Sequence, residues 1–82
     1  MIKETLEVTD LYSLGENSFD SEREYKAFII AFGYADGSKT YKEVESGLNR
    51  LKYRFTQVKG NGKITMILND TSGEDKHYKF IC

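Results

Sequence analysis

The two side chains best suited to nucleophilic or metal chemistry, one histidine and one cysteine, each occur once in this chain. They are His77 and Cys82. In a regular strand an odd and an even position project to opposite faces, so the Cys82 thiol would not reach the His77 imidazole for activation. A zinc site needs about four Cys, His or carboxylate ligands at short spacing. We therefore predict neither a Cys–His catalytic pair nor a zinc site.

Two loops share features with ion-binding loops but lack their defining residues. Gly60-Asn61-Gly62-Lys63 resembles part of a phosphate loop, yet Gln57 stands where the first Gly belongs and Ile64 where Ser or Thr would hold magnesium. The oxygen-rich run at residues 70–75 lacks the length and the terminal Glu of an EF-hand loop. No two carboxylates are set apart as an acid–base pair. The sequence thus predicts a protein that is not an enzyme and that binds no cofactor or metal.

Charge is divided unevenly along the chain. The first 24 residues carry seven acidic and two basic side chains, a net charge of −5, and residues 25–82 carry a net charge of +4. Between Ser46 and Asn69 there are five basic residues and no acidic one. This basic stretch consists of Arg50, Lys52, Arg54, Lys59 and Lys63. It is a candidate surface for a polyanion or for an acidic protein partner.

The clearest predicted element is a β-hairpin over residues 53–70. Asn61-Gly62 is the preferred pair for a two-residue type I′ turn, and this turn pairs Phe55 with Leu68 and Gln57 with Met66. One face then carries the expected core side chains. They are Tyr53, Phe55, Ile64, Met66 and Leu68. Because Arg54 points the other way, charge and aromatic rings lie on opposite sides, which disfavours base stacking along the basic stretch.

A third strand is predicted over residues 76–81, after a polar turn centred on Gly73. That register places Tyr78 opposite Leu68 and Phe80 opposite Met66. The face of this meander that points away from the core carries three aliphatic residues among polar ones. They are Val58, Ile67 and Ile81. Unless another element covers them, they form a candidate docking face for a protein partner or a second subunit.

A helix is predicted to begin at Thr40. Thr40-Tyr41-Lys42-Glu43 is a capping box, in which the Thr hydroxyl and the Glu carboxylate satisfy backbone N–H groups of the first turn. Apolar residues then recur on one helical face at Tyr41, Val44, Leu48 and Leu51. Gly47 weakens the helix, and its usual reason is close packing, which we expect to be against the sheet.

Residues 24–34 fit either a helix or a strand. Ser21-Glu22-Arg23-Glu24 has a capping-box pattern, and the apolar residues that follow match a helical face. The run at residues 26–34 is also aromatic and apolar on both parities, as in a central strand, and we favour the strand. With a weak edge strand over residues 4–12, the expected order is β-β-α-β-β-β. Two helices followed by the hairpin would instead give a winged-helix-like module.

The sequence therefore predicts a single small α+β domain over residues 1–82, an antiparallel sheet with one packed helix. A lone cysteine, no secretion signal and no long apolar run predict a cytoplasmic protein without membrane contact. We expect a small non-catalytic protein that regulates or inhibits a larger complex through a protein partner, as phage or mobile-element anti-defence proteins do. The alternative is a nucleic-acid-binding module using residues 50–63. A third reading is a dimeric small-ligand binder or sponge.

Overall fold

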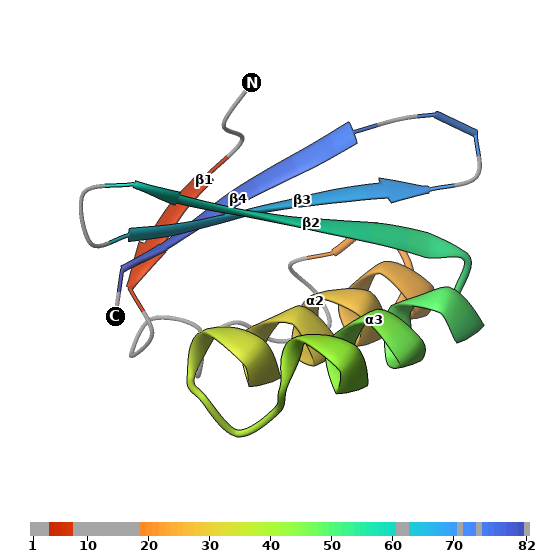
Figure 1. Ribbon diagram of the computed structural model, residues 1–82. Coiled ribbons are helices and arrows are strands. Elements are labelled where there is room, and N and C mark those ends of the chain that lie inside the picture. The colour runs from red at the N-terminus through yellow and green to blue at the C-terminus, as the bar shows by residue number, and fades with distance from the viewer. Residues whose placement is uncertain (1–3, 8–18, 61–62, 71, 74, 82) are drawn as a thin grey trace.

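Two helices lie side by side on one face of a β-sheet in the computed structural model (Figure 1). The structure describes residues 4–7, 19–60, 63–70, 72–73 and 75–81, with the backbone alone at residues 4–7 and 81. In chain order the elements are β1 (Glu4–Glu7), α2 (Glu22–Ala35), α3 (Tyr41–Arg50), β2 (Tyr53–Gly60), β3 (Lys63–Asp70) and β4 (Asp75–Ile81). Strands β2, β3 and β4 form an antiparallel meander, and β1 runs parallel to β4. The predicted edge strand over residues 4–12 falls partly on β1 and partly outside the described residues.

The predicted pairing of the hairpin is confirmed, but the register of the third strand is wrong by two positions. Phe55 faces Leu68 and Gln57 faces Met66. Met66, however, faces Tyr78 rather than Phe80. The shift arises because Asp70 begins the turn, where its carbonyl accepts the Gly73 N–H at 3.1 Å. A shift by an even number of residues leaves every side chain on its predicted face.

Helix α3 begins as predicted with a complete capping box. The Glu43 N–H donates to Thr40 Oγ1 at 3.3 Å, and the Thr40 N–H donates to Glu43 Oε1 at 3.1 Å. The Thr40 hydroxyl also donates to Glu43 Oε1, at 3.0 Å, and the two hydrogen bonds that the charged carboxylate accepts from Thr40 hold the pKa of Glu43 below its ordinary value. Of the predicted apolar face, Val44 and Leu48 are fully buried and Leu51 packs half-buried against the core, whereas Tyr41 is 39% exposed.

The strand predicted over residues 24–34 is wrong, because this segment belongs to α2. Ser21 is the N-cap, with its side-chain oxygen accepting the Glu24 N–H at 3.1 Å. Ala27, Ala31 and Ala35 recur every four residues and are buried, so they allow the helix to lie close to the sheet. From residue 22 onward the order is therefore α-α-β-β-β, which is the element order of the two-helix alternative. Residues 26–34 are apolar at odd and even positions alike because α2 packs against the sheet and against α3.

Aromatic side chains from helix and sheet meet in the core. Phe28 of α2 lies with its ring centroid 5.0 Å from that of Tyr78 and 5.8 Å from that of Phe80. The predicted core face of the hairpin is buried at Tyr53, Phe55, Met66 and Leu68, and Ile64 packs against it half-buried. Within the described strands, the aromatic rings thus lie on the helix-covered face of the sheet.

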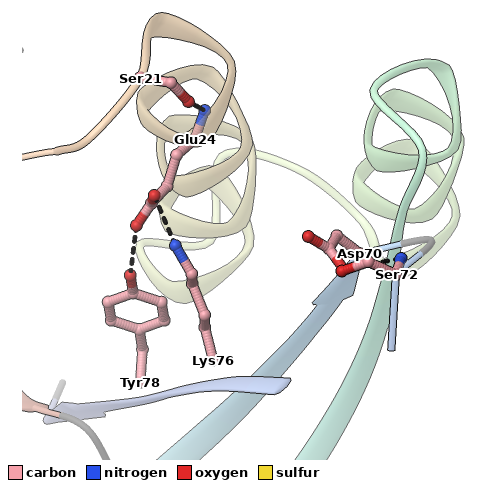
Figure 2. A network of polar contacts seen from close by, with 6 residues as sticks. All are labelled: Ser21, Glu24, Asp70, Ser72, Lys76 and Tyr78. Carbon is pink, nitrogen blue, oxygen red and sulfur yellow. Dashed lines mark hydrogen bonds and ion pairs between the residues drawn. The ribbon is translucent and has the colours of Figure 1, made fainter. Parts of the chain in front are cut away.

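A buried carboxylate fixes the start of α2 over β4 (Figure 2). Glu24 is 7% exposed and lies 2.5 Å from the Lys76 ammonium, and the Tyr78 hydroxyl donates to it at 3.5 Å. Burial disfavours the charged form of Lys76, but the hydrogen bond and the charge of Glu24 outweigh it and raise the pKa of Lys76. The sequence held a signal for this contact, since Glu24 shares the helical face of Ala27, Phe28 and Ala31.

Candidate functional site

The glycine in α3 allows the two helices to approach each other closely. A Cβ atom added at Gly47 would lie 3.1 Å from the Cγ2 atom of Ile30 on α2. The expectation that Gly47 packs on the sheet is therefore wrong, because its close neighbour is the other helix. Because residues 24–34 form helix α2 and not a strand of the sheet, they pack beside α3.

The glycine in α2 makes room for a lysine. A Cβ atom added at Gly33 would lie 2.9 Å from Lys39 Cδ, so the aliphatic stem of Lys39 lies directly on α2. The Lys39 backbone N–H donates to the Gly33 carbonyl at 2.9 Å, and the Ser38 hydroxyl donates to the same carbonyl at 3.1 Å. The backbone of the connection between the helices is thus fixed, and it aims the Lys39 side chain along the helix pair.

A groove of about 460 Å³ lies between the two helices, and we call it the interhelical groove. Its lining residues are Tyr25, Lys26, Ile29, Ile30, Lys39, Gly47, Arg50 and Leu51. It opens away from the sheet, since Lys26, Ile29 and Arg50 are exposed whereas the sheet-facing residues of both helices are buried. Ile29 is 42% exposed, which gives the groove an apolar floor that solvent reaches.

Cations line this floor without a carboxylate among the lining residues. Lys26 is paired with Glu22 at 3.1 Å on the exposed side of α2. An adjoining hollow shares Lys39, Gly47 and Arg50 with the groove and adds Lys42, Ser46 and Glu43. The Glu43 carboxylate already serves the helix cap. Lys39, Lys42 and Arg50 form no ion pair within the part of the chain that the structure describes, although the charge of Lys39 contributes to the lowered pKa of Glu43.

One end of the groove is held by a contact between α2 and the segment after α3. The Arg23 guanidinium donates to the Leu51 carbonyl, at 2.7 Å from Nε, and lies over the Tyr53 ring at 5.3 Å. Leu51 is thereby kept against the end of the helix pair. The residue that follows, Lys52, adopts a positive φ of 63° as the chain turns into β2.

The basic stretch predicted from the sequence does not form one continuous ridge. Arg50 lines the interhelical groove, whereas Arg54 is exposed on the sheet face opposite the helices. Arg54 and Lys59 are five residues apart in β2, a separation of about 17 Å along an extended strand. Lys59 alternates onto the helix side, and Lys63 onto the opposite side. The five basic residues thus lie on different faces of the molecule.

The predicted apolar docking face is open where the structure describes it. Both helices lie on the other side of the sheet (Figure 1). Val58 is 48% exposed and Ile67 is half-buried, and the side chain of Ile81 lies outside the described residues. His77 faces Ile67 in the sheet register and is half-buried, and Cys82 is not among the described residues.

Sequence reasoning named Arg50 as a candidate but missed the other residues that line the groove. Ile29 matches a helical apolar face and would be assigned to the core, and nothing in the sequence around Lys39 marks it as a groove residue. Among the described residues no group of three or more His, Cys, Asp or Glu side chains could hold a metal ion. In the same residues no helix has the length and apolar character needed to span a membrane. No protein family matches this chain, and no curated protein or solved structure matches it either.

Proposed function

We propose that this protein is a non-catalytic binding protein that regulates or inhibits a larger complex by docking a protein partner in the interhelical groove. The observation that carries the proposal is an exposed aliphatic residue, Ile29, in a groove that Lys39 and Arg50 also line, with Lys42 in the adjoining hollow. None of these three cations forms an ion pair among the described residues. Protein interfaces combine an apolar centre with a polar margin in this way. Full burial of an exposed aliphatic side chain contributes about 1.5–3 kcal/mol, so covering Ile29 is worth about 1 kcal/mol.

Two further parts of the proposal come from the sequence. The lone cysteine supports a cytoplasmic site of action. A role against host defence in a phage or mobile element is the concrete form that we favour for a short, Pro-free chain of this kind.

Affinity capture from the native host, with matched variants, tests the proposal. Ile29→Gln combined with Lys39→Gln removes the apolar and the cationic parts of the groove, and both positions are exposed. Val58→Thr is the control, because Val58 is about as exposed but lies on the sheet face. We expect a partner that the wild type and the control recover, and that the groove variant recovers at least about tenfold less. Equal recovery by all three proteins contradicts the proposal, and loss with Val58→Thr alone moves the site to the sheet.

Nucleic-acid binding is the second candidate, favoured by the cations Lys39, Lys42 and Arg50 that gather around one hollow. Fluorescence anisotropy with labelled single- and double-stranded nucleic acid at two salt concentrations tests it. A log–log slope of about three or more would mean several phosphate contacts. Charge reversal at Lys59 and Lys63 then separates the two cationic regions, since neither residue lines the groove or the adjoining hollow. If the anisotropy shows no binding at either salt concentration, this candidate is excluded.

A further inference from the structure

We propose that the segment of the partner that occupies the interhelical groove is an acidic amphipathic α-helix. This inference rests on the proposed function and names the chemistry of the partner. It is carried by the shape of the groove, by the spacing of its cations and by the aliphatic character of its floor.

The shape suits a third helix. Helices α2 and α3 run side by side and are joined by residues 36–40 (Figure 1). Residues of both helices line the groove. A helix laid into such a groove contacts it through apolar residues at positions i, i+3 or i+4, and i+7. With ten residues, α3 is about 15 Å long, so the groove seats about three turns of a partner helix.

The cations occur at a helical spacing. Lys42, Ser46 and Arg50 are four residues apart and share one face of α3, so the two charges are separated by about 12 Å along the axis. Arg50 lines the groove itself, whereas Lys42 lines the adjoining hollow, which Glu43 also lines. Lys39 lies before the same helix and lines both hollows. A partner helix with carboxylates seven or eight residues apart, beside its apolar stripe, would match Lys42 and Arg50. A basic helix would place like charges together in a partly desolvated groove, which is unfavourable.

The floor argues for a protein rather than a nucleic acid. Ile29, Ile30 and Leu51 are aliphatic, and Tyr25 is the one aromatic residue among the lining residues. Single strands bind proteins largely by stacking bases on exposed rings, and this floor offers little ring surface. An aliphatic floor instead fits leucine-like side chains from a helix.

Three labelled synthetic peptides of about 18 residues, or five helical turns, test the inference by fluorescence anisotropy. The first has a leucine stripe flanked by glutamates, the second has lysines in place of the glutamates, and the third has serines in place of the leucines. We expect the leucine–glutamate peptide to bind with a Kd of about 10 µM or tighter, and the other two at least about tenfold more weakly. Lys39→Gln with Arg50→Gln should weaken the first peptide by a similar factor, whereas Lys59→Gln should not change it.

Several results would overturn the inference. These are equal binding of the lysine peptide, binding that Ile29→Gln leaves unchanged, or no binding of the first peptide up to about 500 µM. Displacement of the first peptide by an equimolar single-stranded oligonucleotide would also overturn it. Circular dichroism checks that each variant is folded, and Ile29→Gln should remain so because its side chain is exposed. If capture from the host depends on the groove but the peptides fail, the proposed function stands and the helical partner is wrong.

Discussion

Among the described residues, the interhelical groove and the outer face of the sheet each expose one large aliphatic side chain, but the two surfaces differ in shape and in charge. Ile29 is 42% exposed at the floor of a groove lined by three cations, whereas Val58 is 48% exposed on a sheet face. On that sheet face Asn69 donates to the Asp75 carboxylate, so at least one charge there already has a neighbour within the chain. Exposure alone therefore does not mark a binding site. The groove is distinguished by its concave shape and by Lys39 and Arg50, which form no ion pair among the described residues.

The groove and the sheet face also depend on different contacts, and breaking the buried pair between Glu24 and Lys76 tests this. In Glu24→Ala the Lys76 ammonium would remain largely buried but would lose the carboxylate that neutralises its charge. Because the Lys76 side chain is 18% exposed, we expect a loss of about 2–3 kcal/mol, at the low end for a buried pair. Chemical denaturation measures the loss, and hydrogen exchange should show α2 losing protection before the β2–β3 hairpin. Uniform loss over all elements would contradict this separation.

The same pair predicts the behaviour of the protein in alkali. Since the pKa of Lys76 is raised, its contribution to stability is complete below the ordinary value of 10.5 and is lost as the pH rises through the higher folded value. Thermal unfolding of the wild type should therefore show this loss only in strong alkali. In Glu24→Gln the loss should shrink or disappear, because the charge that raises the Lys76 pKa is gone.

A larger side chain at Gly47, inside the groove, should show most clearly whether binding uses the groove or the sheet face. Gly47→Val places new methyl groups where even a Cβ atom lies 3.1 Å from the Ile30 side chain, so either this side chain or the helices must shift. We expect a loss of about 1–2 kcal/mol from overpacking and at least a tenfold loss of peptide affinity. Thr56→Val, an exposed change on the sheet face, should stay within about 0.5 kcal/mol and keep the affinity. Unchanged binding in Gly47→Val would show that the ligand does not use the groove.

A smaller change distinguishes the groove from the basic stretch. Lys52 belongs to that stretch but is absent from the groove lining, and its φ of 63° is unfavourable for a side chain with a Cβ atom. Lys52→Gly should relieve this strain and stabilise the fold by about 0.5 kcal/mol after the added entropy of unfolded glycine. Peptide affinity should be unchanged. A clear drop in affinity for a polyanion, measured by anisotropy, would instead favour the nucleic-acid candidate.

Local patterns predicted the elements whose cause is local. The capping box at Thr40 and the pairing of Phe55 with Leu68 follow from a few neighbouring residues, and both are confirmed. The secondary structure of residues 24–34 was predicted wrongly as a strand, because a helix packed on two sides shows the same apolar density as a central strand. The groove could not be predicted for the same reason. The close approach of Gly47 to Ile30 exists only when that segment is a helix.

The smallest expected effect is on stability in acid, through the N-terminal cap of α3, the helix that carries Lys42 and Arg50. The pKa of Glu43 is lowered by its hydrogen bonds with Thr40, so its contribution to stability is complete above the ordinary value of 4.5. It is lost as the pH falls through the lower folded value. Glu43→Gln should remove this part of the acid dependence in thermal unfolding, while Glu45→Gln, an exposed change on the same helix, should not. If both variants unfold in acid like the wild type, the hydrogen bonds between Glu43 and Thr40 do not stabilise the start of α3.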